Sequence, residues 1–177
     1  GGITEVPLAD IELISFADIQ TAAEAAEGVT LAFQGVPAGI YTGLKMGLGV
    51  SADLNATQPG DYNPPHPLDN HYWSWARGYV FTKVEGNADL DGDGIFEEKL
   101  TFHIGENEYY RELEILQPIE VRQGGAINLK VDLANVLQRD ASQYLNFRKV
   151  TQDHTTNPEV ATLIADNLLQ AITYPQR

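Results

Sequence analysis

A short acidic segment, residues 87–98, carries the clearest pattern of metal-binding side chains in this sequence. Asp89, Asp91 and Asp93 alternate along a stretch that contains Gly92 and Gly94. Carboxylate oxygens spaced in this way along a tight loop are the ligands that Ca²⁺ takes at about 2.3–2.6 Å. We therefore predict a calcium site here. The alternative is a polar hairpin turn in which Asp and Gly only provide the turn geometry.

Two ligand registers fit the acidic segment. The first begins at Asn87 and closes with a bidentate Glu98, whereas the second begins at Asp89 and closes on Glu97. Because the flanking residues favour strands rather than helices, the segment is not an EF-hand. The predicted oxygen ligands, taking both registers together, are Asn87, Asp89, Asp91, Asp93, Glu97 and Glu98.

Histidines and tryptophans form a second group of candidate residues. His71, Trp73 and Trp75 alternate, so in a strand their side chains point to one face. His103 lies in a neighbouring β-rich segment, where its imidazole could approach that of His71. Two imidazoles without a thiolate suit copper better than other common metals. The alternative, which spacing alone favours, is a hydrogen-bonded core histidine at position 103 and a surface histidine at position 71.

The remaining two histidines, His66 and His154, fall in predicted loops and are kept as further candidate copper ligands. The sequence has no Gly-x-Ser-x-Gly elbow, no His-Glu-x-x-His helix and no phosphate-binding glycine loop. Nothing in it indicates covalent catalysis. We therefore expect a metal-binding protein rather than an enzyme.

Short β-rich segments separated by Gly and Pro turns must position these residues. Residues 78–85 and 99–104 predict a hairpin around the acidic segment, with residues 83–85 opposite residues 99–101. Other strands are predicted at residues 11–16, 29–33, 40–50, 109–116 and 127–133, with a short helix or loop at 18–26 and a surface loop at 55–69. Asn157 and Pro158 begin a helix expected to run to about Thr173. This order predicts one all-β domain over residues 1–177, an antiparallel β-sandwich of the Ig-like or Greek-key type with a short C-terminal helix.

The composition narrows the possible partners. The 177 residues include 25 acidic and 11 basic side chains, for a formal net charge of −14. Such a chain is a poor nucleic-acid binder, and its negative charge fits either cation binding or solubility alone. The absence of cysteine excludes disulfides, zinc–thiolate sites and iron–sulfur clusters. No apolar run approaches the ~20 residues of a membrane span. The start at Gly1-Gly2, without methionine, is compatible with an exported or lipid-anchored protein whose export segment has been removed.

Several segments, in collinear order, resemble the MbnP-like family. These are copper-binding proteins associated with methanobactin operons, and the family includes a copper-repressible surface protein of methanotrophs. The most specific part is Trp-x-Trp, Gly-Tyr-x-Phe and Glu-Gly within residues 73–86, followed by Phe-His-Ile-Gly. The matching segments are residues 36–41, 47–50 with Asn55, 72–86 and 102–105, and His154 ahead of the helix that carries residues 164–167.

The resemblance implies a β-sandwich, an extracytoplasmic location and a mononuclear copper site built from histidines. Carried over to this chain, His103 is the first ligand candidate and His71 the second. The family's oxidation of a tryptophan to kynurenine would fall on Trp73 or Trp75, which could contribute to the site. The acidic segment looks like an addition in this member, so calcium there rests on the residues alone.

We expect an exported protein of copper acquisition or handling with a separate calcium loop. It would lie in the periplasm or at the outer surface of a Gram-negative bacterium, with an unknown partner protein. The first alternative is a calcium-stabilised surface adhesion or carbohydrate-binding β-sandwich module. The second is a copper redox enzyme, which would need an open coordination position.

Overall fold

The computed structural model describes residues 4–73 and 78–175, so Trp75 lies outside the described residues. The α-helices are α1 (Ala22–Glu27), α2 (Ala52–Asn55), α3 (Leu133–Leu137) and α4 (Pro158–Ala171), and three short 3₁₀ helices are η1 (Pro59–Asp61), η2 (Pro67–Asp69) and η3 (Asn107–Tyr109). The strands are β1 (Gly39–Tyr41), β2 (Leu44–Leu48), β3 (Tyr72–Trp73), β4 (Gly78–Ala88), β5 (Glu98–Gly105), β6 (Arg111–Ile115), β7 (Ile119–Val121), β8 (Lys130–Val131), β9 (Gln152–Asp153) and β10 (Ile172–Thr173).

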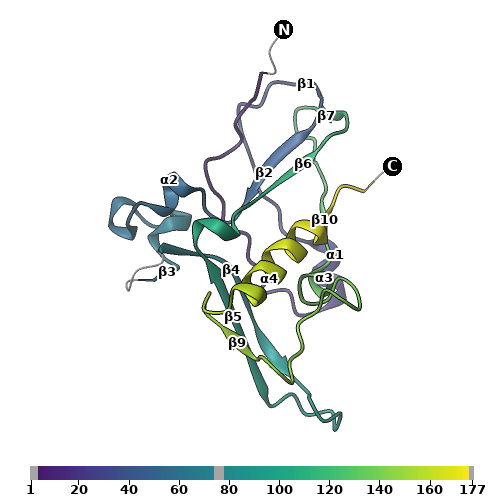
Figure 1. Cartoon of the computed structure of the whole chain (residues 1–177). Coiled ribbons are helices and arrows are strands. Elements are labelled where there is room, and N and C mark those ends of the chain that lie inside the picture. The colour runs from purple at the N-terminus through teal and green to yellow at the C-terminus, as the bar shows by residue number, and fades with distance from the viewer. Residues whose placement is uncertain (1–3, 74–77, 176–177) are drawn as a thin grey trace.

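The hairpin of β4 and β5 is the longest β-structure among the described residues and projects from the body of the molecule (Figure 1). Residues 89–97, the part of the acidic segment between the two strands, form the acidic loop at its tip. Its antiparallel register places Glu85 opposite Thr101 and Asn87 opposite Lys99. The predicted antiparallel hairpin around the acidic segment is therefore confirmed, but its register differs by two residues, because residues 83–85 lie opposite residues 101–103 and residues 99–101 lie opposite residues 85–87. Val, Phe, Ile and Thr are frequent on both strands, and such residues fit a half-buried pleated surface.

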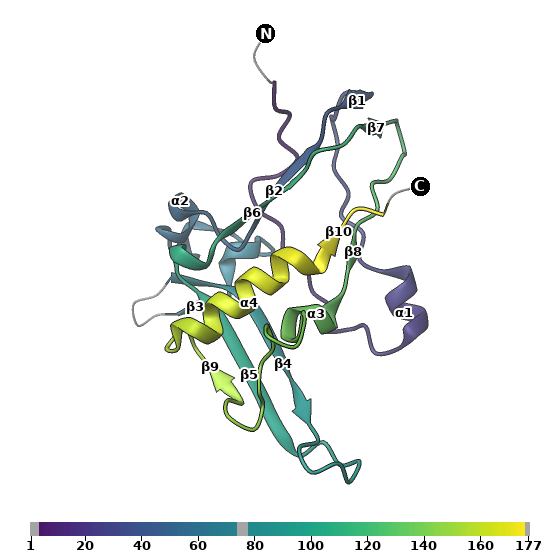
Figure 2. The ribbon, with the colours of Figure 1, turned by 45° about the vertical axis from the view of Figure 1, so that its right-hand side comes forward.

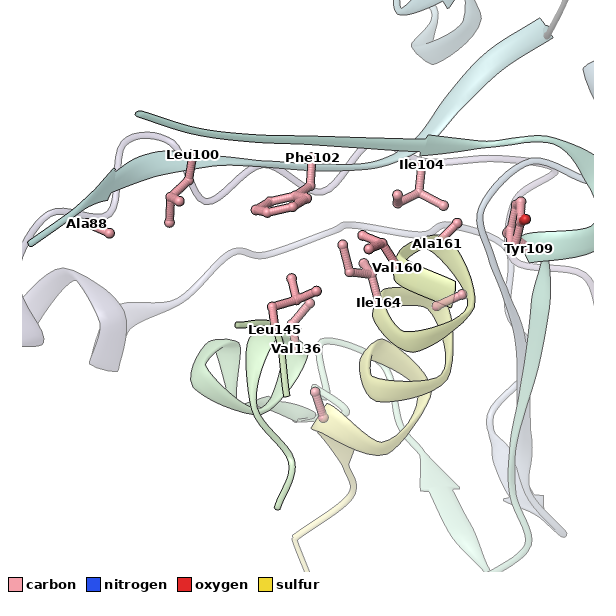
Figure 3. Packing of buried hydrophobic residues seen from close by; sticks show 12 residues of the cluster. Ala88, Leu100, Phe102, Ile104, Tyr109, Val136, Leu145, Val160, Ala161 and Ile164 are labelled. Atoms are coloured by element: carbon pink, nitrogen blue, oxygen red, sulfur yellow. The ribbon is translucent and has the colours of Figure 1, made fainter. Parts of the chain in front are cut away.

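The hydrophobic core lies between one face of this hairpin and helix α4. Leu100, Phe102 and Ile104 alternate along β5 and point to one side, where Phe102 and Ile104 face α4 and Leu100 faces Leu145 (Figure 3). Phe102 and Ile164 are completely buried. Burying side chains of this size stabilises the folded state by roughly 1.5–3 kcal/mol each. Because alternate residues of a strand face opposite sides, the same packing turns His103 away from the core.

Helix α4 begins as its sequence predicts. The side chain of Asn157 accepts a hydrogen bond from the backbone N–H of Glu159, and Pro158 occupies the first turn, where a missing N–H costs nothing. The helix ends at Ala171, and Ile172 and Thr173 continue as β10, which pairs with β8. In Figure 2 the helix runs across the sheet, so its N-terminal end lies close to β9.

Four small sheets hold the strands together. The largest has the order β3-β4-β5-β9, in which β3, β4 and β5 are antiparallel and β9 is parallel to β5. The other sheets pair β2 with β6, β1 with β7, and β8 with β10. The predicted strand at residues 40–50 is divided because β1 and β2 pair with different partners.

Two of the strand predictions are wrong, and a third holds only in part. Residues 11–16 and 29–33 form no strand, and residues 127–133 provide only the two-residue β8 before Leu133 begins α3. Leu13 and Ile14 are both 53% exposed, so their alternation does not reflect a buried face. A β-forming sequence becomes a strand only when a neighbouring edge receives its hydrogen bonds.

The predicted helix or loop at residues 18–26 contains α1, whose N-terminus has a capping box between Thr21 and Glu24.

The described residues thus form a mostly β chain of antiparallel and mixed sheets with a C-terminal helix. Their main core is sheet against helix, and the sandwich arrangement and the single-domain boundary stay predictions. None of the described helices is long and apolar enough to cross a membrane.

Candidate metal centre

His103 lies on the face of β5 that points away from the core. Its cross-strand neighbour is Lys83, and Glu85 lies two residues further along β4 on the same face. The Nε2 atom of His103 is 2.9 Å from Oε1 of Glu85, while Nζ of Lys83 is 3.2 Å from Oε2 of the same carboxylate. The hydrogen bond with His103, reinforced by Lys83, holds the pKa of the Glu85 carboxyl below its ordinary value. The predicted hydrogen bond of His103 is therefore present, but the histidine is not part of the core.

The connection between β9 and α4 brings a second histidine to this face. Asp153, at the end of β9, is only 3% exposed, and its carboxylate accepts hydrogen bonds from the backbone N–H groups of Thr155, Thr156 and Asn157. The hydroxyl of Thr155 donates to the carbonyl of His103 and accepts from the N–H of Gly105. These bonds fix the residues on both sides of His154 and tie the connection to β5.

The two imidazoles meet edge to face. The ring centroids of His103 and His154 are 4.8 Å apart, and the ring planes make an angle of 82°. The indole of Trp73 lies against His154 in a similar edge-to-face arrangement, with centroids 6.4 Å apart. His154 is exposed and the His103 side chain is 16% exposed, whereas Trp73 is buried. The three rings form a cluster with nitrogen donors near the surface and an apolar wall beneath them.

Gly105 makes room for the indole. A Cβ atom at position 105 would lie 2.9 Å from Cζ3 of Trp73 and 2.6 Å from the carbonyl oxygen of Tyr79, distances that no methyl group tolerates. Trp73 on β3 can therefore reach across β4 to the face that carries His103 and His154. This explains the glycine that follows Phe102, His103 and Ile104 in the sequence.

The other two histidines lie elsewhere. The Nδ1 atom of His66 accepts a hydrogen bond from the N–H of Leu68 at the start of η2, and its ring stacks on Tyr62. His71 precedes β3, on the opposite side of β4 from β5, and its φ of 58° breaks the extended alternation expected with Trp73. In the described part of the chain, the imidazole that faces His103 is that of His154, not that of His71.

Sequence reasoning identified His103 and Trp73 but gave no pairing for His154 and did not select Glu85. The hairpin register contains the signal for Glu85, because a residue two positions beyond the cross-strand neighbour shares a face with it. The position of His154 depends on a parallel pairing of β5 with the two-residue β9. No short-range pattern in the sequence predicts the contact between His103 and His154.

The acidic loop at the hairpin tip is the second candidate site. Asp89, Asp91 and Asp93 each place a carboxylate oxygen within 4.8 Å of the others. Asp89 accepts hydrogen bonds from the N–H groups of Gly92 and Gly94, at 2.6 and 2.8 Å. The bond from Gly94 and then that from Gly92 lower the pKa of the Asp89 carboxyl. Both glycines have positive φ, 84° and 88°, which lets the loop curl around the Asp89 carboxylate.

The arrangement favours the second ligand register over the first. Asn87 and Glu98 lie in the paired strands, Asn87 opposite Lys99 and Glu98 opposite Ala88, while Glu97 is exposed beside them. Among the described residues, the acidic side chains that come close enough together to share one metal ion are those of Asp89, Asp91 and Asp93. The guanidinium of Arg148 reaches the loop from outside and donates to the carbonyl of Leu90. The triad is thus a group of three carboxylates close enough together to share one cation.

Comparisons with known proteins bear on the histidine cluster. Searches of curated proteins and of solved structures find no match to this chain. A comparison with models of protein families matches residues 1–161 to the family described as MbnP. That match includes Trp73, Glu85, His103 and His154, and it spans most of the 177 residues. The chain belongs to the MbnP family.

Proposed function

We propose that this protein binds copper outside the cytoplasm through His103 and His154, with Trp73 beside them. The observation that carries the proposal is the edge-to-face contact of the two imidazoles at 4.8 Å. The family match supports a copper-related function, because the MbnP family is associated with copper. The proposal replaces His71 by His154 as the partner of His103.

The side chains in the cluster fit copper. Neutral imidazole nitrogens are good copper ligands, and a chain without cysteine offers no thiolate to attract competing soft metals. His103 and His154 would hold the ion, which would supply a redox-active centre next to an indole. The buried Trp73 would exclude water from one side, and the exposed His154 would leave the other side reachable. The oxidation of Trp73 or Trp75 to kynurenine stays a prediction.

We propose binding rather than catalysis as the role of this site. An exported copper-binding protein, at the periplasmic side or the outer surface of a Gram-negative cell, with or without a lipid anchor, is consistent with the family.

The test is titration of metal-free protein with Cu(I) in competition with a chromogenic chelator. We expect one equivalent of copper to bind to the wild type and none to bind tightly to His103→Ala. His66→Ala is the matched control, because His66 is a histidine at the start of a 3₁₀ helix outside the cluster. Equal stoichiometry and affinity in wild type and His103→Ala would exclude His103 as a ligand and remove the basis of the proposal.

We further propose that the acidic loop binds Ca²⁺ through Asp89, Asp91 and Asp93, with Glu97 as the closing ligand. The support is the convergence of the three carboxylates within 4.8 Å around two glycine turns. Calcium should raise the melting temperature, because only the folded loop presents the ligands together. The measurement compares melting in millimolar calcium with melting in chelator. An unchanged midpoint would contradict the site.

A further inference from the structure

We propose that Glu85 is a positioning residue that fixes the proton of His103 on Nε2, so that His103 offers Nδ1 to copper. This inference rests on the proposed copper site. Glu85 itself would touch no metal; it would act through the imidazole to which it is hydrogen-bonded.

The geometry determines which nitrogen is available. The Nε2 atom of His103 is 2.9 Å from Oε1 of Glu85. An ionised carboxylate can only accept hydrogen bonds, so the neutral imidazole must carry its proton on Nε2 to make this contact. The lone pair of a neutral imidazole then resides on Nδ1. A metal that bound Nε2 instead would have to displace the carboxylate.

Glu85 is itself held in place. Its Oε2 atom lies 3.2 Å from Nζ of Lys83, which is directly opposite His103 in the hairpin ladder. Lys83 and Glu85 share the outer face with His103 because all three positions follow the alternation of paired strands. The carboxylate therefore has one oxygen for the imidazole and one for the ammonium group. Carboxylates hydrogen-bonded behind a ligating histidine orient the ring and raise its basicity.

The direct test is nitrogen NMR of histidine-labelled protein at a pH where the imidazoles are neutral. In the metal-free wild type we expect His103 to be protonated on Nε2, with this proton slow enough in exchange to be observed. In Glu85→Ala the protected proton signal should disappear. On addition of Cu(I), the Nδ1 resonance of His103 should shift while Nε2 keeps its proton. A copper-induced loss of the Nε2 proton in the wild type would overturn the proposal.

Copper affinity provides the second readout. Glu85→Ala should weaken Cu(I) binding by about 10- to 100-fold, the usual effect of removing such a carboxylate. Glu85→Gln should recover much of the affinity, because the amide oxygen can still accept the hydrogen bond from Nε2–H of His103. Glu112→Ala is the matched control, since Glu112 is also a strand glutamate paired with a lysine, Lys45, at 3.3 Å. Unchanged affinity in Glu85→Ala, or equal losses in Glu85→Ala and Glu112→Ala, would contradict a positioning role.

The two proposals fail in different ways. If the wild type binds no copper, the copper site is wrong, while the metal-free spectra still report whether Glu85 holds the Nε2 proton. If copper binds through His103 Nε2, the copper site stands and the role of Glu85 is wrong.

Discussion

The histidine cluster beside the β4–β5 hairpin and the acidic loop at the tip of that hairpin are built in opposite ways. Trp73, His103 and His154 come from β3, β5 and the connection after β9, so tertiary contacts bring them together. The acidic loop is one continuous stretch, residues 89–97, and hydrogen bonds among residues 89–95 set much of its shape. One site depends on contacts between distant segments, whereas the other depends mainly on the β4–β5 hairpin that carries it.

The two sites also differ in chemistry. The cluster offers nitrogen donors beside a buried indole, and the loop offers exposed carboxylate oxygens. Soft or borderline ions such as copper prefer the former, and hard ions such as calcium prefer the latter. A single chain can therefore hold two metals without competition, provided that each site keeps its own donor type.

The largest effect expected is that of His154→Ala on copper. Removing one of two nitrogen ligands should weaken Cu(I) binding by at least about 100-fold, equivalent to ~2.7 kcal/mol. Competition titration measures the copper affinity, and His71→Ala serves as the control. The calcium response should be unchanged. Loss of both copper binding and calcium binding in His154→Ala would contradict the independence of the two sites.

Asp153→Ala tests the dependence of the cluster on the fold. The buried carboxylate of Asp153 accepts three backbone N–H bonds and one from the Thr156 hydroxyl, so its loss should cost about 2–4 kcal/mol of unfolding free energy. Denaturant unfolding measures this cost, and copper affinity should fall with it. The control is Asp140→Ala, because Asp140 makes similar bonds to Ser142 and Gln143 but is exposed. We expect a much smaller loss in Asp140→Ala; equal losses in the two variants would mean that burial of the Asp153 carboxylate is unimportant.

A smaller effect is expected from Asp89→Asn. Replacing one anionic ligand should weaken calcium binding by about tenfold, because affinity follows the number of charged ligands. Isothermal titration measures the calcium affinity, with the exposed Asp18→Asn as control. Copper affinity should not change. If Asp89→Asn melts and binds calcium as the wild type does, the loop is a turn and not a metal site.

The smallest expected effect is the loss of stability at low pH that comes from protonation of Asp89. The pKa of Asp89 in the folded protein lies below its ordinary value of 3.8, so the folded state favours the charged form. The contribution of the Asp89 carboxylate to stability is present above pH 3.8 and is lost as the pH falls through the lower pKa of the folded state. In calcium-free buffer, the difference in melting temperature between wild type and Asp89→Asn should shrink below pH 4. A difference that is constant from pH 7 to pH 3 would show that ionisation of Asp89 does not stabilise the hairpin.

The sequence predicts what depends on local pattern. The β4–β5 pairing, the Asn157 cap of α4 and the carboxylate triad of the loop all follow from residues close together in the chain. His154 could not be placed in this way, because it meets His103 through a parallel pairing between distant segments. The strand predicted at residues 11–16 was wrong for the same reason, since alternation says nothing about the presence of a partner edge.

The tight fit of Gly105 against Trp73 has a consequence for other members of the family. A side chain at position 105 would meet both the indole of Trp73 and the backbone carbonyl of Tyr79, so loss of the indole alone would not make room for it. A relative with alanine or a larger residue after the Phe-His-Ile motif should therefore have its strands shifted around position 79. Reading position 105 would separate the relatives that keep this strand geometry beside the histidines from those that have lost it.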